Sequence, residues 1–182
     1  YFIVSMMLFA IMFLGVHDLY HWSHSDVVAA DPILQHKAPY LNIPFFAIRY
    51  VVFFALWILL ALRIKKLSLR EDKIGGIDFF NKIEKTSKIF IFVFAVSFSL
   101  FTIDWLMSLD AHWYSTIYVV KKFIMAFFHG ASVITAIVLI LYKLGYFPML
   151  TKKHLHDFSR YIWALSLIWG YMWLSQYLLI WY

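Results

Sequence analysis

The chain has 182 residues, of which 64% are hydrophobic, 21% aromatic and 14% charged, whereas soluble domains contain about 45–50% apolar and about 25% charged residues. This composition excludes an ordinary water-soluble domain, and the absence of cysteine excludes disulfides, thiolate iron–sulfur ligation and covalent c-type haem within these residues. The formal charge of +6 comes from basic residues that lie between apolar runs rather than in a stripe of their own, so we expect a membrane protein without a nucleic-acid partner.

Five apolar stretches predict membrane-spanning helices, and the fold class we expect is an all-α polytopic bundle. A hydrocarbon core about 30 Å thick needs about 20 helical residues, and a spanning sheet would need a closed barrel of alternating strands. Because the sequence starts and stops within apolar runs, we expect it to be a fragment of one larger transmembrane domain. The predicted spans cover residues 1–16, 45–62, 89–107, 123–144 and 158–182.

The connecting segments alternate in basic charge. Segment 17–44 carries Lys37 as its single Lys or Arg, whereas segment 63–88 carries eight. Segment 108–122 carries two, both at its end, and segment 145–157 with its flanks carries four. Since cytoplasmic loops are enriched in Lys and Arg, we expect segments 17–44 and 108–122 outside, and segments 63–88 and 145–157 in the cytoplasm.

A short amphipathic helix is predicted within the second of these segments, at residues 77–88. Asp78 is typical of a helix start, and Gly75 and Gly76 before it are typical of a turn. Apolar side chains alternate here with basic ones at helical spacing, so we expect this helix to lie on the inner membrane surface.

An ionisable group inside a predicted span suggests a functional role, because placing a charge in hydrocarbon is costly. Asp104 lies one turn from the end of the third span, on the same face as Ser97 and Ser108. By the predicted topology most polar span residues gather toward the outer side. The candidates for a proton relay or a quinone headgroup site are Asp104, His129, His17, Asp18, His21, Arg49, Asp110, His112, Gln176 and Tyr177.

Two interpretations of these residues stay open. A quinone carbonyl needs donors such as His or Tyr, and quinol oxidation needs a proton acceptor such as Asp or His. In the structural alternative, Arg49 and Asp104 form an ion pair and the remaining His and Tyr anchor the chain at the interface. His17, His21 and His24 have helical spacing, but the helix is expected to end among them, so we predict no metal site.

No haem is expected in these spans either. A b-type haem needs two axial histidines on facing helices within the membrane. Of the histidines in the chain, His129 alone is well placed for such a ligand. We therefore predict that this chain binds no metal or haem cofactor of its own.

Several strings together resemble a known family. They run from Asp31 to Lys37 and on through 41–46, from Phe101 to Thr116, from His154 to Asp157, and from Trp173 to Tyr182. In combination they resemble the F subunits of bacterial alternative complex III, which are NrfD-like membrane subunits of a quinol:cytochrome c oxidoreductase. The resemblance covers nearly the whole chain and departs at 119–122, where uncharged residues are expected.

The resemblance implies a larger fold of about ten helices built on two four-helix bundles. It also implies a multi-pass subunit of the bacterial inner membrane that acts as a scaffold, with quinone or menaquinone binding and proton conduction as further roles. As such it would be a non-catalytic, auxiliary subunit in electron transport. The implied partners are a sister NrfD-like subunit, an iron–sulfur subunit, c-type cytochrome subunits that hold haem c, and a cytochrome oxidase.

Two other functions remain as alternatives. A secondary transporter often places its site at broken helices near the membrane midplane, and in these spans only Gly130 and Gly170 interrupt the apolar runs. A purely structural anchor for peripheral redox subunits is the second alternative. Copurification with multihaem and iron–sulfur subunits separates the transporter from the other two.

The predicted topology can be tested with single cysteines, because the chain contains none. We expect cysteines at Lys65 and His21 to react with a membrane-impermeant maleimide from opposite sides of the membrane, since basic loops stay cytoplasmic. Labelling is measured in right-side-out and inverted vesicles. Reaction of both cysteines from the same side would contradict the topology.

Overall fold

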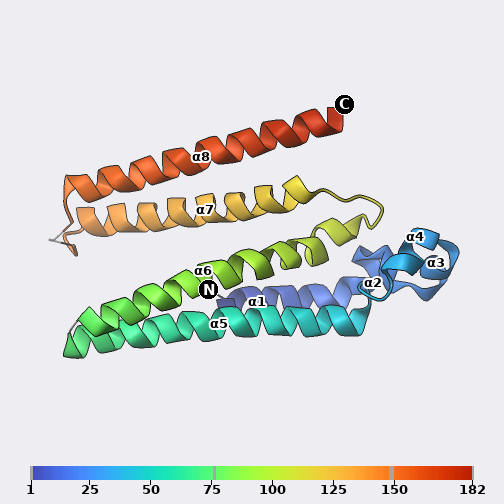
Figure 1. Ribbon diagram of the computed structural model, residues 1–182, viewed down its shortest axis with the longest axis horizontal. Helices are drawn as coiled ribbons and strands as arrows, with labels where there is room; N and C mark the ends of the chain where they lie inside the picture. The colour runs from blue at the N-terminus through green and yellow to red at the C-terminus, as the bar shows by residue number, and fades with distance from the viewer. Residues whose placement is uncertain (1, 76, 148–149, 182) are drawn as a thin grey trace. The chain divides into compact units, whose positions relative to one another are not determined.

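A computed structural model describes residues 2–75, 77–147 and 150–181 (Figure 1). All of the regular secondary structure in these ranges is helical, as the sequence predicts. The chain divides into two compact units, one ending at Tyr114 and one beginning at Ser115. Each unit is described by itself below.

The first unit contains two long helices, α5 and α6, together with a string of short ones. The N-terminal helix α1 passes through a 3-10 turn into α2, and a second 3-10 turn leads to α3 and α4. A third 3-10 turn follows α6. The bounds are α1 Phe2–Met12, α2 Val16–Leu19, α3 Ser25–Ala30, α4 Pro32–Lys37, α5 Ile43–Ile74, α6 Ile77–Trp105 and the last 3-10 turn Met107–Leu109.

Side-chain caps fix where α4 and α5 begin, and a glycine marks where α5 ends. The Asp31 carboxylate accepts a hydrogen bond from the Ile33 amide at 2.8 Å, at the start of α4. The Asn42 side chain accepts one from the Phe45 amide at 2.9 Å, at the start of α5. At the other end of α5, Gly75 has φ of 71°, a conformation that favours glycine.

An aromatic core joins α5 and α6. The buried aromatic side chains of α5 recur at helical spacing, at Phe46, Tyr50, Phe53, Phe54 and Trp57, so that one face of the helix is apolar and bulky. From α6 the ring of Trp105 lies 4.9 Å from that of Phe46, centroid to centroid. Rigid rings that meet edge to face contribute packing energy beyond their buried area.

Three polar bonds hold the elements of this core in register. The Trp57 indole donates from α5 to the Ser97 hydroxyl on α6 at 2.7 Å. The Tyr50 hydroxyl donates to the Met6 carbonyl on α1. The Tyr20 hydroxyl donates to the Trp105 carbonyl at 3.0 Å. Each donor is therefore satisfied without water, as a buried polar group requires.

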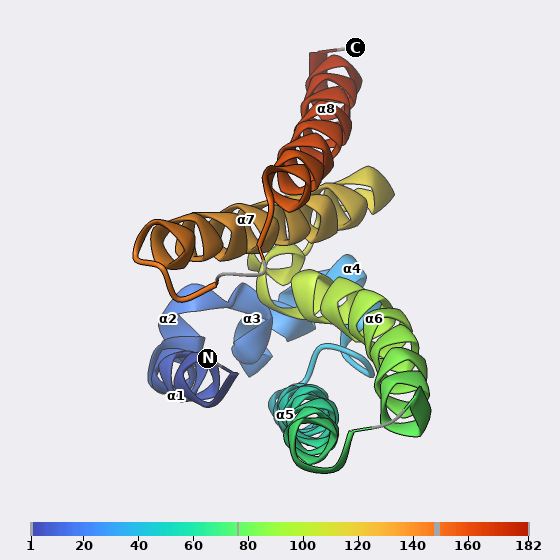
Figure 2. The ribbon, with the colours of Figure 1, turned by 90° about the vertical axis from the view of Figure 1, so that its left-hand side faces the viewer.

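The second unit is a pair of helices, α7 Thr116–Lys143 and α8 Lys152–Trp181, packed against each other (Figure 2). The Ser115 hydroxyl accepts a hydrogen bond from the Tyr118 amide at 3.3 Å and so caps α7. Between the helices, the Phe128 and Trp169 rings stack with an interplanar angle of 15°. Few described side chains of this pair are buried: Val119, Thr135, Leu165 and Gln176.

Three helices are long and apolar enough to cross a membrane: Ile43–Ile74, Ile77–Leu109 and Thr116–Lys143. The second and third predicted spans lie within the first two of them, and the fourth lies within the last one except for its final residue, Leu144. The first predicted span falls on a shorter apolar segment, Ile3–Leu19, and the fifth lies within α8, which is helical over 30 residues. Tyr1 and Tyr182, at the outer ends of the first and last predicted spans, lie outside the described residues.

Two predicted boundaries differ from the structure. The amphipathic segment 77–88 is helical, but it is the first part of α6 and not a separate helix, because neither glycine nor proline interrupts the rest of α6.

Helix α7 begins at Thr116 and not at 123, so segment 119–122 is helical. Lys121 and Lys122 fit there because their ammonium groups lie 5.6 and 5.1 Å from the Tyr118 ring centroid. Gly76, part of the predicted turn, lies outside the described residues.

The aromatic core predicts a large effect of truncating Phe46, which is 1% exposed. We expect Phe46→Ala to lower the free energy of unfolding by about 3–5 kcal/mol, because it leaves a cavity that the surrounding rings cannot fill. Unfolding is measured in mild detergent. Phe92→Ala is the control, since Phe92 on the same pair of helices is 72% exposed, and we expect a change of about 0.5 kcal/mol or less. Equal losses in both variants would contradict the assignment of the core.

Candidate functional site

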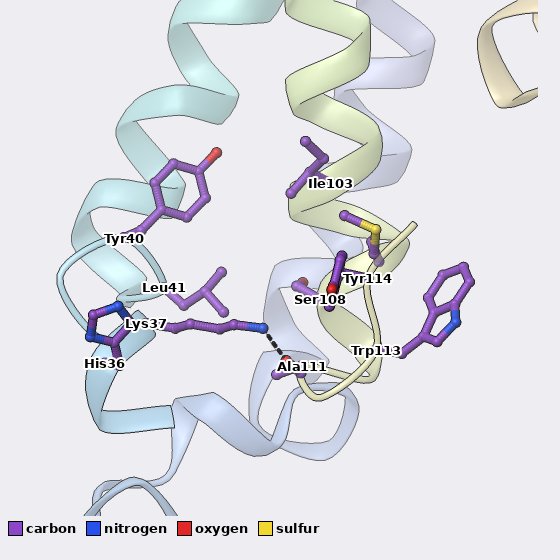
Figure 3. Close-up of a pocket in the computed structure, with 10 residues that line it drawn as sticks. His36, Lys37, Tyr40, Leu41, Ile103, Ser108, Ala111, Trp113 and Tyr114 are labelled. Carbon is purple, nitrogen blue, oxygen red and sulfur yellow. Dashed lines mark hydrogen bonds between the residues drawn. The ribbon is translucent and has the colours of Figure 1, made fainter. Parts of the chain in front are cut away.

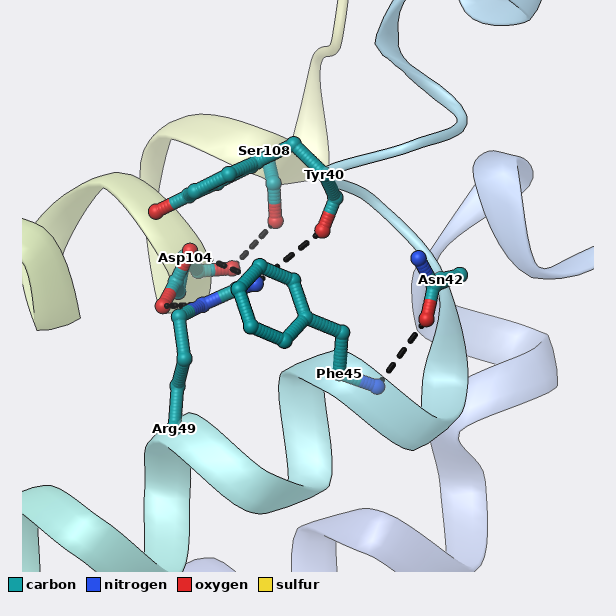
Figure 4. A network of polar contacts seen from close by, with 6 residues as sticks. All are labelled: Tyr40, Asn42, Phe45, Arg49, Asp104 and Ser108. Atoms are coloured by element: carbon teal, nitrogen blue, oxygen red, sulfur yellow. Dashed lines mark hydrogen bonds and ion pairs between the residues drawn. The ribbon is translucent and has the colours of Figure 1, made fainter.

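A buried ion pair lies at the centre of the candidate site. Arg49, in the second turn of α5, donates from Nε to Asp104 Oδ2 at 2.8 Å and from Nη2 to Oδ1 at 3.0 Å (Figure 4). Asp104 lies in the last turn of α6 and is 2% exposed, while Arg49 is 8% exposed. Two parallel bonds between guanidinium and carboxylate are the strongest pairing available to these groups. The Arg49–Asp104 ion pair of the structural alternative is confirmed, and the interfacial anchoring that completes that alternative stays a prediction.

Two aromatic rings, roughly perpendicular to each other, lie against the guanidinium group. Its carbon lies 3.9 Å from the Tyr40 ring centroid and 4.3 Å from the Phe45 ring centroid. Nη1 of Arg49 donates to the Tyr40 carbonyl at 3.1 Å, and the Ser108 hydroxyl donates to the Asp104 carbonyl. The charges are therefore paired, stacked and hydrogen-bonded, which offsets the cost of removing them from water.

Residues spaced four apart along the chain place these groups together, one pair on α5 and one pair at the end of α6. Phe45 and Arg49 are four residues apart on α5, whose start is fixed by the Asn42 cap, and so they share a face. Asp104 and Ser108 are also four residues apart, across the end of α6. The Asn42 cap fixes where α5 begins, and from this start the helical spacing places Arg49 on the side of α5 that faces Asp104 of α6.

Two phenols beside the pair, those of the partly exposed Tyr40 and the buried Tyr20, stay protonated at neutral pH. Desolvation is the largest cause that raises the pKa of Tyr40 to about 12, the negative charge of Asp104 and a side-chain hydrogen bond to Asp104 raise it too, and the charge of Arg49 opposes them. Desolvation and the negative charge of Asp104 raise the pKa of Tyr20 to about 12. Both hydroxyls therefore act as hydrogen-bond donors rather than as anions.

A pocket of about 300 Å³ lies on the other side of Tyr40 (Figure 3). One wall comes from α4 and the residues after it, and the other from the end of α6 and the turn that follows. Apolar and aromatic side chains predominate, and the hydroxyls of Tyr40 and Ser108, the Lys37 ammonium and the His36 ring are the polar groups. The remaining lining residues are Leu41, Ile103, Met107, Ala111, Trp113 and Tyr114. Its size and composition are those of a small-molecule site.

Two polar contacts tie the walls of this pocket together. The Lys37 ammonium donates to the Ala111 carbonyl (Figure 3). Nε2 of His112 lies 2.5 Å from a carboxylate oxygen of Asp31, and the Asp110 carboxylate accepts from the His112 amide at 3.1 Å. The main-chain bond from Ile33 is the largest cause that lowers the pKa of Asp31, and His112 lowers it further.

The other predicted residues of the first unit form a separate histidine group. Nδ1 of His17 lies 3.1 Å from the Ser23 hydroxyl, and Nε2 of His24 lies 2.8 Å from the His17 carbonyl. Asp18 and His21 are exposed. The helix ends at Leu19, so these histidines do not share one helical face. The part of the chain that the structure describes holds no group of three ligand side chains suited to a metal ion.

Three predicted residues belong to the second unit. Gln176 accepts a hydrogen bond from the Ser115 hydroxyl at 3.2 Å and so joins the ends of α7 and α8. Tyr177 stacks on Trp173 with an interplanar angle of 7°. His129 is exposed on α7, with Nδ1 2.8 Å from the Met125 carbonyl. Within the first unit, the candidates thus fall into separate groups of contacts.

Sequence reasoning missed the residues that complete the pocket. Lys37 is the last residue of the six-residue helix α4, and Tyr40 lies in the short stretch between α4 and α5, where periodicity gives no signal. The sequence contains one indication that Lys37 is special: it is the single Lys or Arg of segment 17–44. The spacing of Phe45 and Arg49 would have indicated the stacked ring.

Comparisons with known proteins do not identify a relative. Neither the protein-family models nor the curated proteins give a match to this chain. The role of the site is therefore argued from its residues and their geometry, together with the resemblance noted from the sequence strings.

The ion pair predicts a distinctive pattern in a double-mutant cycle. We expect Asp104→Asn to lower the free energy of unfolding by about 3–5 kcal/mol, because Arg49 is then buried without its counter-charge. The double variant Arg49→Met/Asp104→Asn removes both charges and should be more stable than Asp104→Asn alone. Unfolding in detergent is compared across Arg49→Met, Asp104→Asn and the double variant. Additive losses would show that the two side chains do not depend on each other.

Proposed function

We propose that this chain is an integral membrane subunit of a quinol-oxidising respiratory complex of the alternative complex III type. In this proposal it is a scaffold in the bacterial inner membrane and holds a quinone headgroup in the pocket beside Tyr40. Electrons are carried by iron–sulfur clusters and haem c of partner subunits. The pocket next to a buried, fully paired Arg49–Asp104 site is the observation that carries this proposal.

The chemistry of the pocket suits a quinone. A quinone headgroup is a flat, largely apolar ring with two carbonyl acceptors. The pocket offers apolar and aromatic walls, with Leu41 and Met107 among them, the Lys37 ammonium as a donor, and the Tyr40 hydroxyl, which also interacts with Asp104. A few placed donors in an otherwise apolar cleft are typical of sites for such ligands.

The strings that carry the family resemblance also build the pocket. Strings 31–46 and 101–116 contain all of the lining residues except Tyr40, which lies between the two parts of the first string. They also contain Asp104. Segments that are far apart in the sequence thus meet at one place, and this supports a shared role for them.

Asp104 acts as a positioning residue in this proposal. Both of its carboxylate oxygens accept hydrogen bonds from Arg49, and Arg49 in turn stacks on Tyr40 and bonds its carbonyl. The pair therefore fixes the wall that presents the Tyr40 hydroxyl. The candidate role of a proton relay then falls to groups at the pocket rim, such as His112 and Asp31.

The proposed membrane placement has five spans. α5, α6 and α7 are long and apolar enough to cross a bilayer, and the apolar segment at α1–α2 together with α8 would complete the set. The pocket then lies at the outer surface, and the basic ends of α5 and α6 lie in the cytoplasm. The larger fold of about ten helices remains part of the proposal.

A structural anchor for redox subunits is the second candidate function. The complete pairing of Arg49 and Asp104 favours it, because a satisfied ion pair needs no ligand. The two functions differ in one observable, the occupancy of the pocket by quinone in the intact complex.

The test is photolabelling of the intact purified complex with an azido-quinone. We expect labelled peptides from 36–41 and 107–114, and loss of this label when unlabelled menaquinone is added. Tyr40→Phe keeps the ring over Arg49 but removes the hydroxyl, and we expect labelling to fall about 5- to 100-fold, as for the loss of one buried hydrogen bond worth about 1–3 kcal/mol.

Tyr171→Phe is the matched control, since Tyr171 is an exposed tyrosine on α8, and its labelling should equal that of the wild type. If menaquinone-sensitive labelling occurs on other subunits and this chain is not labelled, the quinone-binding function is rejected and the anchor function remains. Failure to copurify with multihaem and iron–sulfur subunits would reject both.

A further inference from the structure

The helix pair of the first unit is longer than the hydrocarbon core of a bilayer. α5 has 32 residues, or about 48 Å at 1.5 Å per residue, whereas the core is about 30 Å thick. The core takes about 20 helical residues, which from Ile43 reach Leu62, and the next residue is Arg63. In the proposed membrane placement, α5 therefore leaves the hydrocarbon where its basic residues begin.

The register of the two helices puts a lysine of α6 at the same level as one of α5. The helices run in opposite directions, and the Trp57 indole on α5 donates to the Ser97 hydroxyl on α6 at 2.7 Å (Figure 1). Lys66 lies nine residues after Trp57, and Lys88 lies nine residues before Ser97. Both lysines are therefore about 13 to 14 Å from this bond along the helix pair.

Five exposed basic residues form a collar around the helix pair at this level. They are Arg63, Lys65, Lys66, Lys85 and Lys88. Segment 63–69 contains no carboxylate, and segment 84–88 contains one, Glu84, which pairs with Lys88 at 2.7 Å. Among the described residues, the other four form no salt bridge. Five basic groups less one acidic group give the two segments together a formal charge of +4.

The tip of the hairpin beyond the collar has no net charge. Segment 70–83 contains three basic residues and three acidic ones, namely Arg70, Lys73 and Lys82 against Glu71, Asp72 and Asp78. The tip reaches furthest into the cytoplasm, so a soluble acidic partner would favour charge there. Charge confined to the collar instead matches the headgroup layer, which extends about 5–8 Å beyond the hydrocarbon on each side.

The rest of this chain cannot neutralise the collar. Asp157 is the single acidic residue of segment 115–182, against six Lys and Arg, and this count depends on composition alone. The other carboxylates of the first unit lie in segments 18–31 and 104–110, which meet at the opposite end of the helix pair. Negative charge for the collar must therefore come from outside these residues.

We infer that the collar is a binding surface for anionic phospholipid headgroups of the cytoplasmic leaflet. Lys and Arg side chains are attracted to such a surface within about a Debye length, and both donate charge-assisted hydrogen bonds to phosphate oxygens. Orientation in the membrane requires basic charge on one side, but it does not require that charge to gather at one level. The inference rests on the membrane placement in the proposed function and not on its quinone site.

The experiment uses the intact complex in vesicles of phosphatidylethanolamine and phosphatidylglycerol in equal parts. A benzophenone amino acid replaces Leu59, which is 64% exposed one turn before the collar, or Ile48, which is 59% exposed near the other end of α5. Mass spectrometry of the crosslinked peptide identifies the attached lipid. We expect the ratio of phosphatidylglycerol to phosphatidylethanolamine adducts to be about fivefold or more higher at Leu59, and high salt should lower this enrichment.

Two double variants remove equal charge from one stripe of α5. Arg63, Lys66, Arg70 and Lys73 follow Leu59 at spacings of four, three, four and three, so all five share a face. We expect Arg63→Gln/Lys66→Gln, in the collar, to remove most of the enrichment. Arg70→Gln/Lys73→Gln, in the tip, should keep it, because these charges lie about 10 Å further along the helix, about one Debye length away. Each variant keeps six of the eight basic residues of segment 63–88, which preserves the orientation.

Three results would overturn the inference. They are equal adduct ratios at Leu59 and Ile48, an equal loss of enrichment in the two double variants, and adducts at Leu59 with peptides alone, which would mean that protein covers the collar. The membrane placement itself fails in a different way, because neither position then gives lipid adducts. A quinone pocket that proves empty would leave the lipid enrichment unchanged.

Discussion

Polar groups that leave water must find their partners inside the protein, and this constraint organises the first unit. Arg49 and Asp104 come from the ends of two long helices, and neither charge could be buried without the other. Their bond fixes where α5 and α6 meet. The stacked ring of Tyr40 and the bond to its carbonyl then bring the segment before α5 against the pair. The pocket exists because this segment is held there.

The aromatic core explains why the pair can sit where it does. In a membrane, helices gain little from the hydrophobic effect when they associate, so contact area and polar bonds must hold them together. Phe46 and Trp105, whose rings lie 4.9 Å apart, come from the same ends of α5 and α6 as the charged groups, and the Trp57–Ser97 bond lies further along the same contact. Large rigid rings exclude water from the guanidinium and the carboxylate. This exclusion strengthens the interaction between the two charges.

The helical class and the ion pair were predictable from the sequence, because both follow from the cost of polar groups in hydrocarbon. The start of α7 was not. The predicted span begins at 123, with Lys121 and Lys122 compatible with either the loop or the helix start, whereas the helix includes both, and their ammonium groups lie near the Tyr118 ring. The pocket was not predictable either, because α4 and the turn after α6 take their positions from contacts such as Lys37 with Ala111. Periodicity describes helices, but it does not describe the turns between them.

The two units differ in how far they satisfy their own polar groups, and this difference bears on what each can do. In the first unit, apart from the Trp22 indole, the buried side-chain donors described end on partners within the unit. Such a unit can present a defined pocket by itself. In the second, His129 and Trp169 each keep an unmatched ring nitrogen among the described residues, on helices that bury few side chains. The two helices of the second unit bury few of their side chains against each other, so they satisfy fewer of their polar groups between themselves than the first unit does.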